Sequence, residues 1–283
     1  MKIWVIGKNG QLGQCFLRVL GLEDVVSTGR KDVDISDKFQ VQEFLKDKNP
    51  DVVINCAAYT EVDKAESDRE SCYKVNSFGV KILAQSCRDS GAHLIHFSTD
   101  FVFSGDKSIG YEVDDEANPL GVYGESKLQG EREIKKESAS ATIIRVSWLY
   151  SEYSKNFVKT MINLGKTREE VSVVADQIGS PTYAMDLAEF VVNNLDSLLL
   201  QRGTNIIHFS NLGEVSWFDF AEQIMKLANL KCKVNPIPSC DYPTAAKRPL
   251  YSVLDIAETG NVLDLDVKNW TDSLRRCLNN MFF

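Results

Sequence analysis

Two residues four positions apart, Tyr123 and Lys127, have the types and spacing that could do proton-transfer chemistry. At this spacing both side chains lie on one face of a helix, about one turn apart. A nearby ammonium favours the anionic form of a phenol, whose pKa is otherwise about 10, so the pair could act as an acid or base near neutrality. An exposed tyrosine beside a solvated lysine gives the same pattern, so the surrounding segments must decide between the two interpretations.

A glycine-rich segment follows directly after the first predicted strand. The apolar run over residues 2–6 predicts a buried strand, and the stretch after Gly13 is amphipathic, as in a helix. Here Gly7 would allow a sharp exit from the strand, Gly10 would let the backbone approach a pyrophosphate, and Gly13 would let the helix pack closely. The Gly-x-x-Gly-x-x-Gly spacing differs from the commonest fingerprint, but its position favours a dinucleotide site over a structural turn.

The end of the second predicted strand, residues 25–28, is where such a fold contacts the adenosine ribose. An acidic residue there would bind a free 2′-hydroxyl, whereas an arginine would bind a 2′-phosphate. The strand end carries Arg30 and no carboxylate, which favours NADPH, with NADH as the second option and a solvated turn as the alternative. Asp34 and Ile35 follow, where an acidic and an apolar side chain could contact the adenine.

Two further strands are predicted to end at the same edge of the sheet. Residues 51–55 lead into small residues, on which a flat ligand could lie. Residues 92–97 lead into a Ser-Thr-Asp segment at 98–100, whose hydroxyls could hydrogen-bond a substrate carbonyl, although an ordinary turn or helix cap is the alternative. The loop over residues 101–122 is long enough to be a lid or a binding loop.

Strands and helices alternate along residues 1–150, which predicts an α/β fold with a Rossmann-like, doubly wound parallel sheet. Residues 62–90 are expected to form one long helical region, and residues 181–200 a turn and a long helix. The regularity weakens afterwards, so residues 151–283 are assigned mainly to a smaller, mixed α/β substrate-binding lobe, with some later segments able to return to the first domain. Arg248 in this part is a candidate for holding an anionic group, the alternative being a surface arginine.

The composition indicates an ordinary globular protein of the cytoplasm. The 283 residues are 43% hydrophobic and 25% charged, and the net charge of −8 argues against an extended nucleic-acid or anionic-membrane surface. Seven scattered cysteines without a Cys-x-x-Cys pair fit reduced thiols. His93 and His96 flank an apolar strand and are interpreted as structural. With no charged leader and no apolar run of membrane length, the sequence predicts a cytoplasmic location.

Several longer runs together resemble one family, the dTDP-4-dehydrorhamnose reductases of the extended short-chain dehydrogenase/reductase superfamily. The resemblance covers essentially the whole chain, and the runs are too long for chance to explain them. They are the glycine segment, Asn55 to Glu66, Ser98-Thr99-Asp100-Phe101-Val102-Phe103, Val122-Tyr123-Gly124-Glu125-Ser126-Lys127, Ser147-Trp148, Asn156-Phe157, Asp176-Gln177-Ile178-Gly179-Ser180-Pro181-Thr182 and Arg248-Pro249.

The resemblance implies the last step of dTDP-L-rhamnose biosynthesis, which serves cell-surface polysaccharides: hydride transfer from NADPH to the C4 ketone of dTDP-4-dehydro-L-rhamnose. Tyr123 would donate the proton, Lys127 would bind the nicotinamide ribose and lower the tyrosine pKa, and Thr99 would hydrogen-bond the ketone oxygen. The implied cofactor contacts are Gly7, Gly10, Gln11, Leu12, Gly13, Arg30, Asp34, Ile35, Ala58, Tyr59, Thr60, Tyr123 and Lys127. The implied substrate contacts are Thr99, Asp100, Tyr123, Trp148, Asn156 and Arg248.

Two alternatives stay open, and one departure from the family pattern matters. The alternatives are a reductase of another nucleotide 4-keto-6-deoxysugar and a non-catalytic regulatory subunit of the methionine adenosyltransferase type; the intact Thr99, Tyr123 and Lys127 speak against the second. The resemblance also implies, for some relatives, a dimer bridged by a metal on glutamates. Cys15 and Met185 stand at the expected acidic positions, so we expect no metal, while a homodimer remains an option.

Overall fold

Six parallel strands form the main sheet of the computed structural model, which describes residues 1–21, 23–137, 140–201, 203–264 and 266–282. The strands run in the order β10–β5–β4–β3–β1–β2, so the direction of winding reverses between β1 and β3. Their bounds are β1 (Ile3–Ile6), β2 (Val25–Thr28), β3 (Val52–Asn55), β4 (His93–Thr99), β5 (Ser140–Val146) and β10 (Gly203–Phe209).

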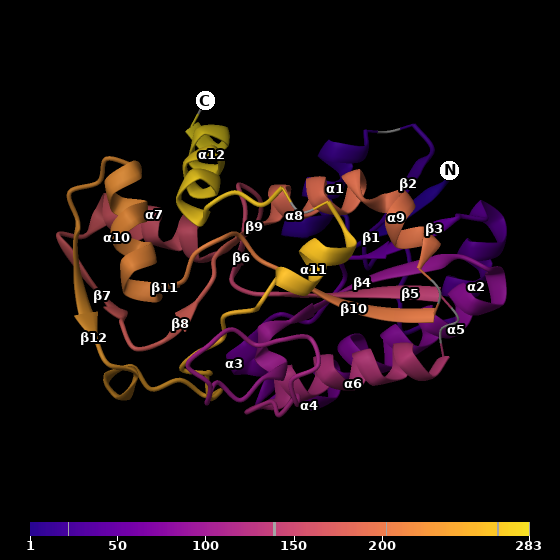
Figure 1. Cartoon of the computed structure of the whole chain (residues 1–283), viewed down its shortest axis with the longest axis horizontal. Coiled ribbons are helices and arrows are strands. Elements are labelled where there is room, and N and C mark those ends of the chain that lie inside the picture. Colours follow the sequence, from indigo (N-terminus) through magenta and orange to yellow (C-terminus); the bar gives the residue numbers. More distant parts are fainter. Residues whose placement is uncertain (22, 138–139, 202, 265, 283) are drawn as a thin grey trace.

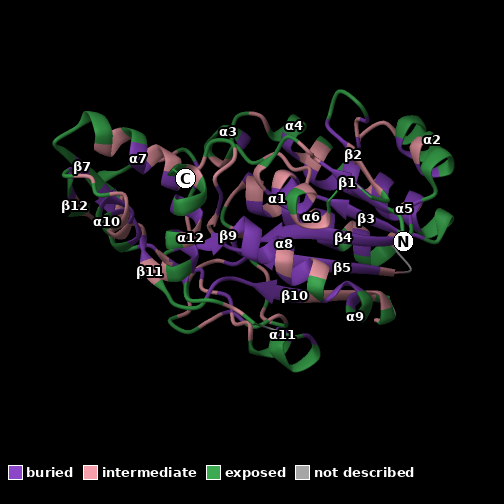
Figure 2. Ribbon diagram, turned by 90° about the horizontal axis from the view of Figure 1, so that it is seen from above, coloured by how far each residue is buried: buried purple, intermediate pink, exposed green. Residues whose placement is uncertain are grey.

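Helices cover both faces of this sheet (Figure 1). One face carries α1 (Gln11–Leu20), α8 (Ala184–Asn193) and α9 (Leu195–Leu200), and the other carries α2 (Lys38–Lys48), α5 (Val80–Ser90) and α6 (Val122–Glu137). Because successive strand residues point to opposite faces, Val5 packs with the first set and Ile6 with the second. Figure 2 shows the strands buried between the layers. The predicted doubly wound α/β fold is confirmed.

A smaller group of elements lies beside the sheet, at the left of Figure 1. It contains α7 (Phe157–Thr167), β7 (Glu170–Val174), β8 (Ile178–Gly179), β11 (Val215–Ser216), α10 (Trp217–Leu227), β12 (Lys233–Ile237) and α12 (Trp270–Phe282). Short elements connect it to the sheet: β6 (Leu149–Tyr150), β9 (Thr182–Tyr183), a 3-10 turn (Ser239–Asp241) and α11 (Ala257–Val262). Three elements after residue 150, namely β10, α8 and α9, pack on the main sheet, as allowed for by the predicted return of later segments to the first domain. The assignment of the remaining residues after 150 to a separate substrate-binding lobe stays a prediction.

Two regions that the sequence pattern predicts as long helices are divided. Residues 62–90 form α3 (Val62–Ala65), α4 (Arg69–Tyr73), a π-helical turn (Lys74–Gly79) and α5. The π turn places Asn76 so that its amide accepts the Tyr59 N–H and donates to the Tyr59 carbonyl. Residues 181–200 are interrupted at Asn194, whose amide donates to the Phe190 carbonyl at the end of α8. In both places side-chain bonds to the backbone compete with a continuous helix.

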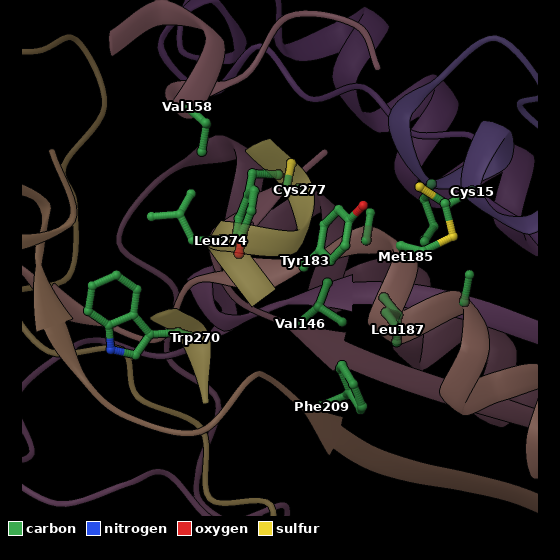
Figure 3. Packing of buried hydrophobic residues seen from close by; sticks show 14 of the residues in the cluster. Cys15, Val146, Val158, Tyr183, Met185, Leu187, Phe209, Trp270, Leu274 and Cys277 are labelled. Carbon is green, nitrogen blue, oxygen red and sulfur yellow. The ribbon is translucent and has the colours of Figure 1, made fainter. Parts of the chain in front are cut away.

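Apolar packing joins the sheet to the smaller group of elements (Figure 3). One buried cluster runs from α1 and α8 to α12 and includes Cys15, Met185, Leu274 and Cys277. Cys15 and Met185 are 0% and 2% exposed. Burial raises the pKa of the Cys15 thiol, so this side chain is a neutral packing group. The two positions that depart from the family pattern therefore belong to the interior of this chain.

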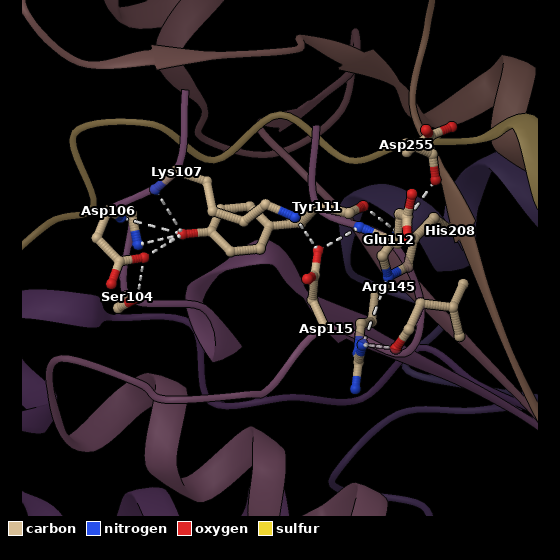
Figure 4. A network of polar contacts seen from close by, with 11 residues as sticks. Ser104, Asp106, Lys107, Tyr111, Glu112, Asp115, Arg145, His208 and Asp255 are labelled. Carbon is tan, nitrogen blue, oxygen red and sulfur yellow. Dashed lines mark hydrogen bonds and ion pairs between the residues drawn. The ribbon is translucent and has the colours of Figure 1, made fainter. Parts of the chain in front are cut away.

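The loop after β4 is held by buried polar contacts (Figure 4). The phenol oxygen of Tyr111 accepts two backbone N–H bonds from the start of the loop, at 2.9 and 3.0 Å. Arg145 on β5 donates to the Val113 carbonyl at 3.1 Å and forms an ion pair with Glu131 of α6 at 2.8 Å. The loop is therefore packed against the sheet over much of its length.

His208 on β10 completes this network (Figure 4). Its Nε2 lies 3.4 Å from Arg145 Nη1, and its Nδ1 lies 3.1 Å from the carbonyl oxygens of Tyr111 and Asp255. A neutral ring with Nδ1–H donating and Nε2 accepting satisfies all of these contacts. Burial, together with the charge of Arg145, lowers the pKa of His208 from 6.5 to about 4. Burial likewise lowers the pKa of His93 on β4 to about 4.

We expect the free energy of unfolding to fall as the pH drops from about 7 to about 5. The native state keeps both rings neutral down to about pH 4, whereas the unfolded chain takes up protons below about pH 6.5. The stabilisation is therefore complete above pH 6.5 and is lost toward pH 4, by roughly 1–2 kcal/mol per histidine between pH 7 and 5. Urea unfolding at the two pH values measures this change. His208→Gln, which does not titrate, should show a smaller pH dependence; an unchanged dependence would contradict the assignment.

Candidate active site

The candidate residues gather at one edge of the main sheet, where the parallel strands end. Gly7 follows β1, Arg30 lies after β2, Ala58 lies after β3, Asp100 follows β4 and Trp148 lies after β5. Parallel strands end at a common edge, so residues far apart in the sequence come together there. The reversal between β1 and β3 lies at this edge, which is where open α/β sheets bind ligands.

The glycine segment forms a backbone cradle at the start of α1. Gly7 has a φ of +84°, and a Cβ there would lie 2.9 Å from the Ala57 nitrogen. A Cβ on Gly13 would lie 2.3 Å from the Gly7 carbonyl oxygen, so glycine is needed for this approach. Gly10 caps the helix, whose first turn carries no acidic residue and presents unpaired N–H groups. This shape and polarity fit the pyrophosphate of a dinucleotide.

Gln11 connects the cradle to the second half of the chain. Its Oε1 accepts hydrogen bonds from Ser151 Oγ and Asn156 Nδ2, both at 3.0 Å, while Leu12 is buried. Asn156 also accepts the Lys159 N–H and so caps α7. The Asn156 amide is thus engaged within the protein, and its contact with a substrate stays a prediction.

The turn after β2 carries a carboxylate, Asp32, so the prediction that this strand end has none is wrong. Arg30 is exposed there, whereas Lys8 of the glycine segment lies 2.7 Å from the Asp32 carboxylate. The same carboxylate accepts the Gly29 N–H at 2.8 Å, so it is occupied within the turn. The position of Asp32, two residues after Arg30 in the sequence, was the signal from which this carboxylate could have been predicted. The arrangement leaves the Arg30 guanidinium exposed for an anionic partner.

The adenine-side candidates lie next to one another, on the turn that follows β2. Asp34 Oδ1 accepts the Ser36 N–H at 2.9 Å and the Ser36 hydroxyl at 2.7 Å, which fixes the carboxylate in the turn. Ile35 is buried and packs against Gly79, where an ideal Cβ would lie 2.8 Å from the isoleucine side chain. The turn after β2 therefore places a polar side chain, Asp34, next to an apolar one, Ile35, and their contact with an adenine stays a prediction.

The backbone at residues 58–60 is linked by hydrogen bonds to α6, the helix that carries Tyr123 and Lys127. The Asn76 amide that clamps the Tyr59 backbone also donates to Ser126 Oγ on α6 at 3.0 Å. Ser126 in turn donates to the Tyr123 carbonyl at 2.7 Å. The bonds of Asn76 therefore join the segment after β3 to α6.

Tyr123 and Thr99 lie together at the end of β4. Tyr123 stands in the first turn of α6, and the Thr99 side chain lies close enough to its phenol to affect the pKa of Tyr123. Burial raises the pKa of Tyr123, and the charge of Asp100 adds to this rise while the Thr99 side chain opposes it. Tyr123 is therefore a protonated phenol at neutral pH, as a proton donor must be.

Lys127 is directed into the sheet. Its Nζ donates to the Phe97 carbonyl at 2.6 Å and lies 3.3 Å from His96 Nε2, and the residue is 2% exposed. Burial lowers the pKa of Lys127 to about 8. The contacts of Nζ go to β4, so an effect of Lys127 on the pKa of Tyr123 stays a prediction. His96, interpreted from the sequence as purely structural, contacts this lysine.

Asp100 is a buried carboxylate with one free oxygen. It is 2% exposed; its Oδ1 accepts from the Thr99 hydroxyl at 3.1 Å, and the Ser252 side chain lies near the carboxylate. Within the described part of the chain, Oδ2 has no hydrogen-bond partner. Burial raises the pKa of Asp100 to about 6, although Ser252 and Thr99 oppose the rise. No local pattern pointed to Ser252, which arrives from a distant segment.

Trp148 lies against the smaller group of elements. Its ring stacks on Trp217 with centroids 3.5 Å apart and an interplanar angle of 6°. A Cβ on Gly179 would lie 2.4 Å from the Trp148 ring, so glycine is needed beneath it. The φ of Trp148 is +45°, a left-handed conformation that is uncommon outside glycine. The tertiary contacts therefore hold this indole in a conformation that its local sequence does not favour.

Arg248 forms an ion pair rather than projecting freely into water. Its Nη2 lies 2.7 Å from Asp63 Oδ2 on α3, and the other oxygen of Asp63 accepts the Ala246 N–H at 3.2 Å. The guanidinium is about one quarter exposed, at 27%. Arg248 is therefore not an ordinary surface arginine without a partner, because it is paired with Asp63. An anion that binds the guanidinium would compete with the Asp63 carboxylate.

Within the residues that the structure describes, no three His, Cys, Asp or Glu side chains lie together in a way that could hold a metal ion. The absence of a metal and the oligomeric state stay predictions. None of the described helices has the length and apolar character that a membrane crossing requires.

Comparison with known proteins gives matches along the full length. The family model described as RmlD substrate binding domain matches residues 1–283. A curated dTDP-4-dehydrorhamnose reductase of Sinorhizobium fredii is 38% identical, over 98% of this chain and 96% of the relative.

Solved structures give the same result. A crystal structure of a dTDP-4-dehydrorhamnose reductase from Clostridium acetobutylicum has a TM-score of 0.95 and 39% identity, and the match covers 100% of both chains. The dTDP-4-dehydrorhamnose reductase of Bacillus anthracis, in complex with NADP, has a TM-score of 0.93 and 39% identity, over 99% of this chain and 100% of the other.

Proposed function

This chain belongs to the dTDP-4-dehydrorhamnose reductase family, and we propose that it reduces the C4 ketone of dTDP-4-dehydro-L-rhamnose with NADPH. This reaction would be the last step in the biosynthesis of dTDP-L-rhamnose, which serves cell-surface polysaccharides. The NADP bound to the Bacillus anthracis protein supports the choice of cofactor, and the cradle at Gly7, Gly10 and Gly13 fits it. A nucleotide-sugar substrate made and used by biosynthetic enzymes supports a cytoplasmic location.

The observation that carries this proposal is the placement of Tyr123 beside Thr99 at the end of β4, on the same helix as the buried Lys127. NADPH supplies the hydride. As negative charge builds on the ketone oxygen, Tyr123 donates its phenolic proton and the Thr99 hydroxyl donates a hydrogen bond. The raised pKa of Tyr123 keeps the proton in place until that charge develops. Lys127 is the nearest residue on the same helix face that can carry positive charge.

Three side chains support recognition of a nucleotide sugar. Among the described residues, the buried Oδ2 of Asp100 has no hydrogen-bond donor, and a sugar hydroxyl could donate a hydrogen bond to it. Trp148 presents an aromatic surface, held by Trp217, on which a sugar could pack. Arg248 would exchange Asp63 for the diphosphate, because a guanidinium binds phosphate oxygens in a bidentate geometry.

The proposed reaction is tested with purified protein and enzymatically prepared dTDP-4-dehydro-L-rhamnose, followed by the loss of NADPH absorbance. We expect turnover and a dTDP-L-rhamnose product by mass spectrometry and NMR. Turnover only with another nucleotide 4-keto-6-deoxysugar would move the substrate assignment. Tight NADPH binding without turnover of any keto-sugar, together with capture of a methionine adenosyltransferase, would replace the enzyme by a regulatory subunit.

Removing the Arg30 guanidinium is expected to weaken NADPH binding selectively. Arg30→Ser should raise the KM for NADPH roughly tenfold and leave the KM for NADH within about twofold, because only NADPH carries the 2′-phosphate. Steady-state kinetics with both cofactors measures the change. Lys38→Ser removes the same charge from an exposed position at the start of α2 and is the matched control. Equal losses for both cofactors in Arg30→Ser would contradict the assignment.

We expect the KM for the sugar nucleotide to rise as the pH falls below about 6. Burial raises the pKa of Asp100 to about 6, so its carboxylate is ionised above this pH and loses acceptor capacity below it. Asp100→Asn should raise this KM roughly tenfold at pH 7.5 and remove the rise at low pH. Kinetics between about pH 5 and pH 8, with the KM for NADPH as internal control, measures both effects. A wild-type KM that is flat across this range would count against the role of Asp100.

A further inference from the structure

One buried histidine beside the candidate active site has contacts on both ring nitrogens. His96 on β4 is 0% exposed, and its Nδ1 lies 3.0 Å from Asn55 Nδ2 on the neighbouring strand β3. On the other side, Nε2 lies 3.3 Å from the Nζ of Lys127, which donates to the Phe97 carbonyl. A chain of polar contacts therefore runs from β3 through the imidazole to the lysine.

The backbone of β3 sets the direction of these hydrogen bonds. The Ala57 N–H donates to Asn55 Oδ1 at 3.1 Å, so the NH2 group of Asn55 faces the imidazole. Nδ1 must then accept, which places the single proton of a neutral imidazole on Nε2. That N–H points at Lys127 Nζ. Two donors would oppose each other there unless Nζ is an uncharged amine with a free lone pair.

We propose that Asn55 and His96 are positioning residues that present an N–H group to Lys127 and hold its side chain as an amine able to take up and release a proton. The proposal rests on the proposed reduction, in which each turnover consumes one proton. The O–H bond of Tyr123 breaks as the O–H bond of the alcohol forms. Re-forming the phenol takes one proton, which an ammonium at Lys127, four residues along the same helix face, can give up with one N–H bond breaking. The resulting amine takes up a hydronium proton from solution, so each turnover removes one proton from solution.

The groups around Lys127 are consistent with this behaviour. His96 faces it from β4, Cys72 from α4 and Glu131 from the next turn of α6. Burial lowers the pKa of Lys127 to about 8, with Glu131 and Cys72 acting against the change. Burial first, and the charge of Lys127 second, lower the pKa of His96 well below its usual range. The imidazole therefore stays neutral while the lysine titrates.

Nitrogen-15 NMR of histidine-labelled protein without cofactor tests the tautomer directly, because protonated and unprotonated ring nitrogens have distinct shifts. The chain has three histidines, so His93→Gln and His208→Gln identify the His96 signals. We expect the proton on Nε2 above about pH 8, where Lys127 is mainly the uncharged amine. A proton on Nδ1 would overturn the proposal. This measurement needs no substrate, so its result is independent of whether the proposed reaction is correct.

Asn55→Asp tests the consequence for catalysis. The carboxylate has nearly the same shape, but it accepts from both the Ala57 N–H and an Nδ1–H, so it moves the ring proton to Nδ1 and makes Nε2 an acceptor for a Lys127 ammonium. In the pH profile of kcat/KM, we expect the decline at alkaline pH to move to higher pH by about one unit or more, because the variant stabilises the Lys127 ammonium.

The matched control is His93→Gln. His93 is also buried on β4, but it bonds Ser140 and Thr142, so its loss should leave the alkaline decline in place. An unshifted decline in an Asn55→Asp protein whose tautomer has switched would overturn the proposal. If Asn55→Asp does not fold, the wild-type NMR result decides by itself.

Discussion

Tyr123→Phe is expected to lower kcat by about 10²- to 10⁴-fold and to leave the KM values within a few fold. The substitution removes only the phenol oxygen, which is the proposed proton donor beside Thr99. The ring stays, and with it the edge-on packing against Phe101, with centroids 5.7 Å apart. Binding geometry should therefore persist while the transition state loses its proton donor. Oxidation of NADPH by wild type and variant under saturating substrate measures the loss.

A second tyrosine provides the control for this experiment. Tyr73 on α4 is also partly buried and hydrogen-bonds Glu125 of the same helix α6 at 3.1 Å, away from the end of β4. Tyr73→Phe should therefore retain most of the wild-type kcat. Fluorescence titration with NADPH should give similar affinities for all three proteins. A Tyr123→Phe enzyme that keeps more than about a tenth of kcat would exclude Tyr123 as the proton donor.

Arg145→Met is expected to lower the free energy of unfolding by about 3–5 kcal/mol. Arg145 and Glu131 are 5% and 2% exposed at the side chain and form a bidentate pair, at 2.8 and 3.0 Å. Loss of the guanidinium leaves the Glu131 charge buried without its partner and also removes the bond to the Val113 carbonyl. Urea unfolding near neutral pH measures the loss.

Two variants separate the buried charge from the general effect of losing an arginine. The double variant Glu131→Gln with Arg145→Met should recover much of the stability, because it removes the isolated charge. Arg275→Met breaks an exposed pair with Asp272, whose side chains are 54% and 61% exposed, and should cost at most about 1 kcal/mol. Additive losses in the double variant would show that burial of the charge is not the cause.

Local patterns in the sequence were sufficient for the fold class and for most of the edge on which the site lies. The apolar runs that became β1, β3 and β4 are short and continuous, and the glycine segment falls directly after the first of them. Parallel pairing then places all the strand ends together, so Gly7, Ala58 and Thr99 could be predicted to meet without knowledge of any contact between them.

The interruptions of the helices could not be predicted in the same way. Asn76 and Asn194 act through side-chain bonds to the backbone that depend on where the neighbouring chain lies. Helical periodicity is a property of one segment, and it carries no information about a partner carbonyl or N–H from another segment. The predictions therefore succeeded for the main-sheet strands within residues 1–150, missed β10, and failed for the continuity of these two helical regions.

The sequence by itself determined that Tyr123 and Lys127 share a helix face, that a glycine cradle follows the first strand, and that the chain has an α/β fold. Only the tertiary structure decided which partners these residues have. The Lys127–His96 contact spans 31 positions, the Asn55–His96 contact 41 and the Arg248–Asp63 pair 185. Hydrophobic periodicity specifies which face of an element is buried. The pairing of polar groups inside depends on the packing of whole elements, and this packing turned Lys127 toward β4.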